Sequence, residues 1–385
     1  MLIDVTRLLD RAMRARLPTG IDRVGLAYVS YFRGRARALV RFSGRWLVLS
    51  DTDSKRLFDG LLSHSGNIRQ LIIWLIGRST VLSWKQPSRG SILINTGHCG
   101  IESEDYGRQV RRCGLQTIYF LHDLIPVRFP EYCRPGEWER HDRRLRTILE
   151  TGRGIVVNSA TTGKELASYA DSFGLNVPEC ITAHLAPPDF PANINEPPLR
   201  EPYFVILATI EPRKNHLLLL NLWRRLVNIY GSDSPRLVVI GQRGWECEQV
   251  VDMLERCEVL KGHVIEISGC DDTVLANWVA NALALLFPSF AEGYGIPLVE
   301  ALSLGTPVIA SDLPVFRELA GDIPEYLDPI DGEGWYRAVL EYAEINSPRR
   351  AAQKARMVGW KAPTWDQHFE KIEDFMKQSL RAPRE

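Results

Sequence analysis

Cysteine is scarce and scattered in this sequence of 385 residues. The seven cysteines are odd in number and include no Cys-x-x-Cys pair, which argues against a disulfide framework or a zinc site and favours reduced thiols. Long hydrophobic runs are missing too, since the longest aliphatic run, 71–76, is too short to span a bilayer. The first residues lack the basic segment, apolar core and cleavage site of a secretory signal. A cytoplasmic protein is therefore expected.

The net charge is zero, because 47 Lys and Arg residues balance 47 Asp and Glu residues. The halves differ, however: residues 1–190 contain 27 cationic against 19 acidic side chains, and residues 191–385 contain 20 against 28. A basic half suits an anionic membrane face or a diphosphate-bearing acceptor, and a merely solvated arginine-rich surface is the alternative. No nucleic-acid partner is expected, because the cations are not interleaved with stacking aromatics in a known motif.

The basic excess is strongest at the start of the chain. The first fifty residues contain ten arginines and three acidic residues. If the first stretch is helical, apolar side chains would lie beside its cations, and a peripheral contact with the inner face of the cell membrane is predicted. The residues concerned are Arg7, Arg11, Arg14, Arg16, Leu8, Leu9 and Met13.

Strand-like and helix-like patterns alternate along the chain in two series, and the segment 187–202, with six prolines, separates them as an extended linker. This alternation predicts two doubly wound α/β domains, 1–190 and 191–363, with ligands at the carboxyl ends of the strands. The length agrees with two domains. An amphipathic helix is expected at about 364–380, with Phe369, Ile372 and Phe375 or Met376 on one side. The expected strands are 1–6, 38–42, 46–50, 91–96, 116–122, 154–158 and 181–185, then 203–209, 236–241, 263–268, 282–287 and 307–311.

Two glutamates, Glu292 and Glu300, have seven residues between them. Glu292 lies in the turn between a predicted buried strand and a predicted helix, and Glu300 lies about one turn into that helix. Gly293 and Gly295 allow the turn to bring backbone N–H groups close to a ligand, and Pro297 suits the first turn of the helix. A helix N-terminus binds anions, while carboxylates accept hydrogen bonds from sugar or ribose hydroxyls. The pattern therefore predicts a ligand that is rich in hydroxyls and bears phosphates. A capping Glu292 with a solvated Glu300 is the alternative.

Residues 264–320 resemble the donor half of the retaining glycosyltransferases of family four, which have the GT-B fold and an E-x7-E signature. The match includes the Glu-Gly-Tyr-Gly turn that begins at Glu292, the segment 305–311 and the segment 318–322. The resemblance implies two Rossmann-like domains facing across a cleft, with the C-terminal helix crossing back to the N-terminal domain. It implies an acceptor-binding first domain and a second domain that binds a nucleotide sugar. The implied donor-binding residues are Gly293, Tyr294, Gly295, Ile296 and Glu300, with Glu292 as a catalytic residue.

The segment Glu-Pro-Arg-Lys-Asn at 211–215 follows a predicted strand and is expected to open a long helix that reaches about Tyr230. Two cations in a first turn oppose the helix dipole, and a bound diphosphate would reverse that effect. The family uses the lysine, and often an arginine, to neutralise the leaving nucleoside diphosphate, so the resemblance implies this role for Lys214 and Arg213. Many relatives have Gly-Arg where this chain has Ala208-Thr209, and Arg213 is the residue that would compensate.

The N-terminal half offers two further matches to the same family. The segment 118–130 resembles its His-Asp-Leu-x-Pro motif, which implies that His122 meets the transferred sugar, although an isolated histidine beside an apolar run is more often a core residue. Thr19 and Gly20 resemble the glycine-rich first loop of these enzymes, which approaches phosphate or acceptor. His98 is a weaker candidate on the acceptor side.

The combined prediction is a hexosyltransferase of polysaccharide biosynthesis that needs neither a metal nor another cofactor. Its expected partners are a nucleotide sugar, with a GDP-mannose-like donor favoured, and a glycan or lipid-diphosphate-linked acceptor. Three alternatives stay open: a sugar-nucleotide epimerase, which shares the two-domain fold, a non-catalytic partner subunit, and a metal-dependent transferase that uses the Asp-x-Asp pattern of Asp51 and Asp53. The position of these two aspartates beside a turn favours helix-capping acids instead of a metal site.

Overall fold

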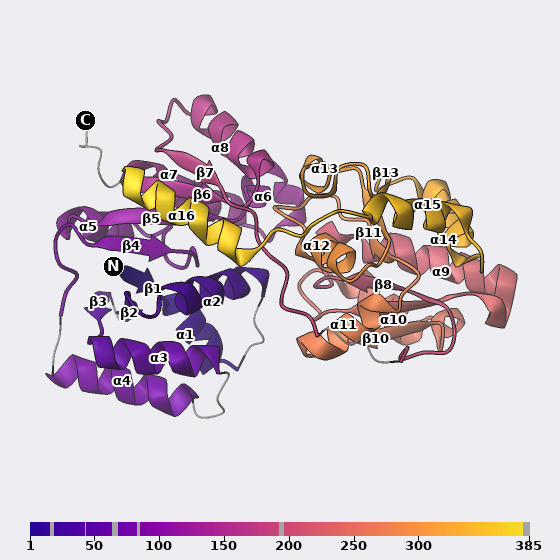
Figure 1. Cartoon of the computed structure of the whole chain (residues 1–385), viewed down its shortest axis with the longest axis horizontal. Helices are drawn as coiled ribbons and strands as arrows, with labels where there is room; N and C mark the ends of the chain where they lie inside the picture. The colour runs from indigo at the N-terminus through magenta and orange to yellow at the C-terminus, as the bar shows by residue number, and fades with distance from the viewer. Residues whose placement is uncertain (16–18, 43, 64–67, 83–84, 192–195, 380–385) are drawn as a thin grey trace. The chain divides into compact units, whose positions relative to one another are not determined.

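The computed structural model describes the chain except for residues 16–18, 43, 64–67, 83–84, 192–195 and 380–385 (Figure 1). The chain divides into two compact units. Unit 1 consists of Met1–Leu185 and Thr364–Glu385, and unit 2 consists of Ala186–Pro363. The first division falls at Leu185, close to the boundary at residue 190 that the sequence predicted.

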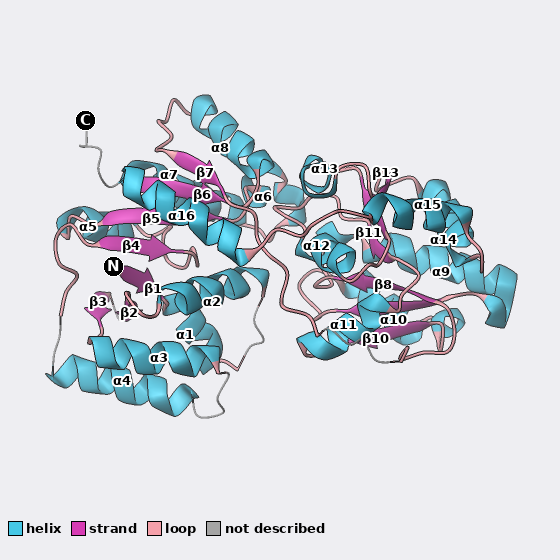
Figure 2. Cartoon of the chain, viewed as in Figure 1, coloured by secondary structure: helices cyan, strands magenta, loops and turns pink. Residues whose placement is uncertain are grey.

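The described part of unit 1 contains a seven-stranded sheet in the order β3-β2-β1-β4-β5-β6-β7 (Figure 2). All neighbouring strands are parallel except β2 and β3, which form an antiparallel pair. The chain order reverses between β1 and β4, so the carboxyl ends of these strands form a topological switch point. The strands are β1 Leu2–Asp4, β2 Arg37–Phe42, β3 Arg45–Val48, β4 Ile92–Asn95, β5 Gln116–Leu121, β6 Gly152–Val157 and β7 Cys180–Thr182.

Helices pack against this sheet, and α4 forms an additional layer because it packs on α3 and α1. Gly154 of β6 allows a close contact with the C-terminal helix, since a Cβ there would lie 2.4 Å from the Phe375 ring. The helices of unit 1 are α1 Thr6–Met13, α2 Gly20–Phe32, α3 Asp51–Leu62, α4 Ile68–Leu82, α5 Glu104–Arg112, α6 Ile125–Arg128, α7 Glu137–Thr151, α8 Ala160–Ser172 and α16 Trp365–Ser379.

Unit 2, in its described residues, has a fully parallel six-stranded sheet in the order β10-β9-β8-β11-β12-β13. Its switch point lies between β8 and β11. The strands are β8 Tyr203–Leu207, β9 Arg236–Ile240, β10 Val264–Ile267, β11 Leu285–Phe287, β12 Val308–Ser311 and β13 Glu325–Leu327. The helices are α9 His216–Tyr230, α10 Glu248–Arg256, α11 Asp272–Ala280, α12 Ile296–Ser303, α13 Pro314–Ala320, α14 Gly332–Ala343 and α15 Pro348–Met357.

Each strand expected from the sequence has a counterpart in the two sheets, so the predicted fold class of two doubly wound α/β domains is confirmed. The predicted C-terminal helix is α16, and its contact with β6 places it in unit 1. Its apolar residues Phe369, Ile372, Phe375 and Met376 are all buried, as their spacing predicted. The expected cleft between the domains stays a prediction.

The N-terminal arginines do not form the surface that the sequence suggested. Helix α1 is present, but Leu8 and Leu9 are buried in unit 1, and of the three expected apolar side chains Met13 is the exposed one. Arg7 and Arg11 both form ion pairs with Asp22 of α2, while Arg16 lies outside the described residues. The expectation that Leu8 and Leu9 form an exposed apolar side is therefore wrong, and the membrane contact itself stays a prediction. No helix in the described ranges combines the length and apolarity that crossing a bilayer requires.

Candidate active site

The candidate site of unit 2 lies where two loops leave neighbouring parallel strands. One loop follows β8 and contains residues 211–215, and the other follows β11 and ends at the start of α12. The backbone N–H of Phe290 donates to the carbonyl of Arg213 over 2.9 Å and joins the two loops. Because β8 and β11 flank the switch point, these loops occupy the position at which open α/β sheets bind ligands.

The first loop has a local structure that the sequence did not predict. Pro212–Lys214 forms a 3-10 turn, and α9 begins only at His216. Asn215 separates the two with a left-handed conformation (φ 57°), which asparagine tolerates better than most residues. Its amide donates to the carbonyls of Pro288 and Pro329. The prediction that both cations occupy the first turn of the long helix is therefore wrong, because Asn215 breaks the helix before they are reached.

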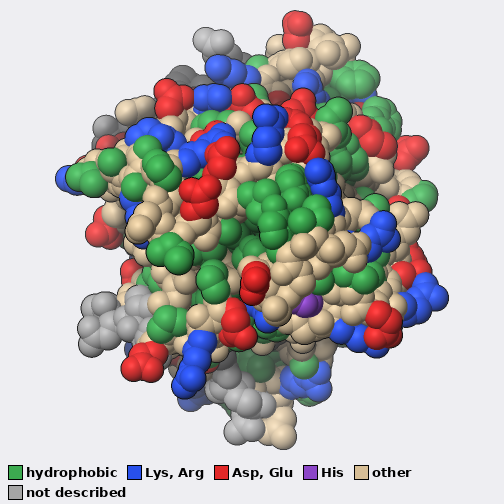
Figure 3. Space-filling model, turned by 90° about the vertical axis from the view of Figure 1, so that its right-hand side faces the viewer, with side chains coloured by type: hydrophobic (Ala, Val, Ile, Leu, Met, Phe, Trp, Pro, Cys, Tyr) green, Lys and Arg blue, Asp and Glu red, His purple; other side chains and the backbone are tan. Residues whose placement is uncertain are grey.

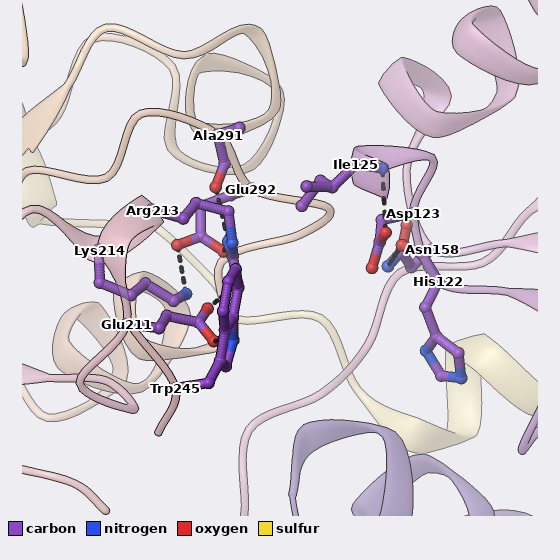
Figure 4. A network of polar contacts seen from close by, with 10 residues as sticks. All are labelled: His122, Asp123, Ile125, Asn158, Glu211, Arg213, Lys214, Trp245, Ala291 and Glu292. Atoms are coloured by element: carbon purple, nitrogen blue, oxygen red, sulfur yellow. Dashed lines mark hydrogen bonds and ion pairs between the residues drawn. The ribbon is translucent and has the colours of Figure 1, made fainter. Parts of the chain in front are cut away.

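The structure brings together Arg213, Lys214 and Glu292, three of the residues that the sequence analysis assigned to the donor site (Figure 4). Lys214 Nζ lies 2.5 Å from Glu292 Oε1, and Arg213 Nη1 lies 2.8 Å from Glu292 Oε2. Arg213 Nη1 also donates to the carbonyl of Ala291 over 2.6 Å. One carboxylate thus holds both cations at the switch point. Lys214 has further donor hydrogens in addition to the one that this contact uses.

Burial and charge act in opposite directions on the Glu292 carboxyl. Burial raises its pKa, but the positive charges of Arg213 and Lys214 outweigh burial and lower the pKa to about 2. Burial and the charge of Arg213 lower the pKa of Lys214, and Glu292 opposes them. Glu292 is therefore an ionised acceptor at neutral pH, able to receive hydrogen bonds from ligand hydroxyls.

The remaining predicted donor residues lie in the turn and in α12. Gly295 caps the helix with φ of 113°, and a Cβ there would lie 2.7 Å from the Phe316 ring, so only glycine fits. Gly293 precedes this cap, Tyr294 is buried, and Ile296 is the first helical residue. Glu300 is buried within α12, which contradicts the alternative of a solvated surface residue. The roles of these residues in donor binding stay predictions.

Two residues of this cluster had no role in the sequence-based prediction. Glu211 Oε1 accepts from Arg213 Nη2 over 2.6 Å, and Trp245 Nε1 donates to Glu211 Oε2 over 3.3 Å (Figure 4). Trp245 lies in the loop after β9, which Gly244 ties to the backbone of Ile210. Trp245 lies 34 residues after Glu211 in the sequence, so the sequence did not indicate this contact. Glu211 could have been found, because it lies in the same short segment as Arg213 and Lys214.

In unit 1, His122 and His98 connect the ends of neighbouring strands. His122 Nε2 donates to the carbonyl of Thr96 over 2.7 Å, and His98 Nε2 donates to the carbonyl of Phe120 over 2.5 Å. Asn158 donates to the His122 carbonyl and fixes the backbone there (Figure 4). Burial lowers the His122 pKa to about 4, although the bond to Thr96 opposes it. His122 is thus neutral at physiological pH, with the Nδ1 lone pair as its remaining acceptor.

Thr19 and Gly20 stand at the start of α2 on the surface of unit 1. Asp22 Oδ2 accepts from both the backbone N–H and the hydroxyl of Thr19, which forms a capping box. Arg7 binds Asp22 and also donates to Thr19 Oγ1 over 3.4 Å. The charges of Arg7 and Asp22 both act on the His122 pKa, so this loop and His122 belong to one electrostatic neighbourhood.

The two aspartates of the metal-dependent alternative do not face a common site. Asp51 and Asp53 lie in the first turn of α3, which Ser50 caps by accepting from the Asp53 N–H. The Asp51 side chain is 91% exposed, whereas the Asp53 side chain is 3% exposed. Positions two apart on a helix point in different directions, so these carboxylates complement the helix N-terminus.

The two doubly wound units, with the last helix returned to the first unit, define the GT-B architecture. Among solved structures, the HepE protein of Anabaena in complex with UDP has a TM-score of 0.66 at 12% identity, covering 98% of this chain and 99% of that one. This similarity concerns the fold alone.

Sequence comparisons identify the family. The model of glycosyl transferases group 1 matches residues 190–324. The O-antigen chain mannosyltransferase B of Escherichia coli is 30% identical over 262 residues, which cover 65% of this chain and 67% of that protein. The serotype-specific mannosyltransferase WbdA of Escherichia coli is 25% identical over 281 residues, 68% of this chain and 33% of that protein, so the chain spans about one third of this relative. The chain belongs to the glycosyl transferases group 1 family.

Proposed function

We propose that this protein is a retaining hexosyltransferase that takes its sugar from a nucleoside diphosphate donor. The observation that carries the proposal is the contact of Glu292 with both Arg213 and Lys214 at the switch point of unit 2. Two cations there suit a diphosphate, and an ionised carboxylate beside them suits sugar hydroxyls. Mannose in a GDP-linked donor is the leading candidate, because the relatives named above are mannosyltransferases.

The proposed reaction breaks the bond between the anomeric carbon and the phosphate oxygen while the acceptor hydroxyl attacks the same face. The departing phosphate oxygen accepts the proton of that hydroxyl. Negative charge grows on the diphosphate during this step, and Lys214, Arg213 and the backbone amides of Gly293 and Gly295 stabilise it. His122, neutral and held through Nε2, presents Nδ1 to a hydroxyl of the transferred sugar.

The acceptor in this proposal is a glycan or a lipid-diphosphate-linked sugar of polysaccharide biosynthesis, bound by unit 1. The loop of Thr19 and Gly20 would contact it or the donor phosphate. We place the reaction in the cytoplasm, in keeping with the seven cysteines, none of which forms a disulfide.

Incubation with GDP-mannose and an oligomannoside acceptor tests the proposal. We expect a longer oligosaccharide whose new linkage keeps the anomeric configuration of the donor, as read by proton NMR. UDP-glucose and UDP-N-acetylglucosamine serve as alternative donors. Conversion of the donor sugar without acceptor would identify an epimerase instead, and the absence of turnover with every donor would favour a non-catalytic partner subunit.

Transfer is expected to proceed without a divalent metal, because Arg213 and Lys214 already supply the cationic charge. Chelation with EDTA should change the initial rate by less than about twofold. Asp51→Asn should behave in the same way, since this exposed carboxylate contacts Arg37 and not the cluster. A rate that collapses on chelation and returns with Mn²⁺ or Mg²⁺ would favour the metal-dependent alternative.

A further inference from the structure

The histidines of this protein lie mainly in its interior. Five of the eight are buried in the described ranges, and the face of the molecule drawn in Figure 3 shows little histidine at its surface. A buried ring nitrogen is ordinarily hydrogen-bonded, so the partners of each ring show what that ring holds in place. His141 on α7 is 3% exposed and has no role in the transfer proposed above.

Both ring nitrogens of His141 have partners. Arg144 Nη1, one turn later on α7, lies 2.9 Å from Nδ1, and the carbonyl of Asp123 lies 3.2 Å from Nε2. A guanidinium can only donate, so Nδ1 is the acceptor and Nε2 bears the hydrogen. Arg144 therefore fixes the tautomer in which His141 donates to the Asp123 carbonyl.

The surroundings keep His141 in the neutral form that this tautomer requires. Burial lowers its pKa to about 4; the charge of Asp123 opposes burial, and that of Arg144 adds to it. Arg144 is itself buried, and its Nη2 lies 3.7 Å from Glu102 Oε2. A guanidinium keeps its proton, and the nearby carboxylate compensates its charge. Arg144 thus holds the His141 ring from one side, and the ring holds Asp123 on the other.

A second side chain holds the preceding carbonyl. Asn158, directly after β6, donates to the carbonyl of His122 over 2.8 Å (Figure 4). The Asn158 Oδ1 accepts from the Thr162 hydroxyl over 3.1 Å, which fixes the orientation of the amide. Residues 122 and 123 follow β5 directly. Two successive peptide groups at the end of this strand are therefore held, one from α7 and one from the end of β6.

These contacts determine where the His122 ring points. Its Nε2 is bound to the Thr96 carbonyl, but a ring held at one atom can still swing about that contact. Fixed peptide groups on the C-terminal side of His122 remove this freedom, because its Cα cannot shift. Asp123 Oδ1 adds a further contact by accepting from the N–H of Ile125 over 3.0 Å. Nδ1 of His122 therefore keeps one direction.

We propose that His141 and Arg144 are positioning residues of the transferase, which hold His122 through the Asp123 carbonyl so that its Nδ1 meets the transferred sugar. This role rests on the proposed function, which gives His122 that contact. Neither His141 nor Arg144 touches the sugar, so both act only on the geometry of the reacting complex. A displacement of about 1 Å is enough for a loss of about 10²-fold in rate.

Three variants of these two residues test the proposal. His141→Phe keeps a ring and removes both hydrogen bonds, so kcat should fall about tenfold or more, with donor KM within about twofold of wild type. Arg144→Met removes the donor to Nδ1 and should have the same effect, while Glu102 keeps its contact with Arg140. In His141→Gln, the amide can donate to the carbonyl and accept from Arg144, so kcat should stay within about threefold of wild type.

His368 of α16 provides a matched control. It is buried in the same unit, its Nδ1 lies 3.0 Å from the His184 carbonyl, and its Nε2 lies 3.0 Å from the Tyr28 hydroxyl. Burial lowers its pKa to about 4, as it does for His141. His368→Phe should lower the urea midpoint of unit 1, as His141→Phe should, but its kcat should stay within about twofold of wild type.

Hydrogen exchange followed by mass spectrometry tests the same claim without donor or acceptor. In peptides that cover 121–127, exchange should become about threefold or more faster in His141→Phe and Arg144→Met, because the segment opens more often. Wild type, His141→Gln and His368→Phe should exchange alike there. Wild-type exchange in both His141→Phe and Arg144→Met, or kcat within about twofold of wild type in both, would overturn the proposal.

A loss of kcat in His368→Phe as large as that in His141→Phe would also overturn it, because the effect would then be general to buried histidines. Circular dichroism checks the fold of each variant, and Arg144→Met decides the question if His141→Phe does not fold. Absence of turnover by wild type with every donor is a different result. It would overturn the proposed function, while exchange would still decide whether His141 and Arg144 hold residues 122 and 123.

Discussion

Replacement of Lys214 by alanine is expected to lower kcat by about 10²–10³, the loss typical of removing one group that stabilises transition-state charge. The ammonium group is held at the switch point by Glu292, and charge on the leaving diphosphate grows only as the sugar departs. Glu292→Gln should have a loss of the same order, because it removes the ionised acceptor that positions both cations. Steady-state kinetics with saturating donor measures both effects.

The fold should survive the change at Lys214, since Arg213 still contacts the Glu292 carboxylate. Lys261→Ala is the matched control, because this lysine is exposed and forms an ion pair with Glu258 one turn away. Its kcat should stay within about twofold of wild type. If Lys214→Ala matched Lys261→Ala in rate, the assignment of the cationic cluster to catalysis would be wrong.

Truncation of Phe375 to alanine is expected to cost about 3–5 kcal/mol of the stability of unit 1, the range for a buried phenylalanine. Phe375 is buried and packs against Gly154, where even a methyl group would collide with its ring. Urea unfolding followed by circular dichroism measures the change. Two units can unfold in separate transitions, and the shift should be confined to one of them.

Phe42→Ala provides the comparison, because this side chain at the end of β2 is 57% exposed. It should cost less than about 1 kcal/mol. Equal costs for the two variants would mean that α16 is not an integral part of unit 1, and the assignment of the C-terminal helix to that unit would fail.

The fold was predictable because, in most elements, the spacing of apolar residues and the length of the segment indicated the same type of secondary structure. The continuous apolar run before Pro288 predicted β11, and the spacing of Phe369, Ile372 and Phe375 predicted α16. β13 was missed, since Glu325–Leu327 is a three-residue strand whose side chains are only partly buried. The hydrophobic pattern of so short a strand cannot be distinguished from that of a loop.

The candidate site was predictable where a residue belongs to a short sequence motif. Lys214 and Glu292 were each found in a motif of their own, and the structure brings them into contact although they are 78 positions apart. The 3-10 turn before α9 was missed because it depends on tertiary bonds from Asn215 to the carbonyls of Pro288 and Pro329. Trp245 was missed for the same reason, since its contact with Glu211 depends on the alignment of β8 and β9.

The central claim is that Arg213 and Lys214 receive the diphosphate of the donor. Calorimetric titration with GDP, and with UDP as the alternative base, tests it most directly, because the free nucleoside diphosphate carries the charge that develops during transfer. We predict that wild type and Lys261→Ala bind one of these nucleotides equally. Lys214→Ala should bind it about tenfold or more weakly, as expected for loss of a charge-assisted contact. Equal affinity of wild type and Lys214→Ala for that nucleotide would contradict the account.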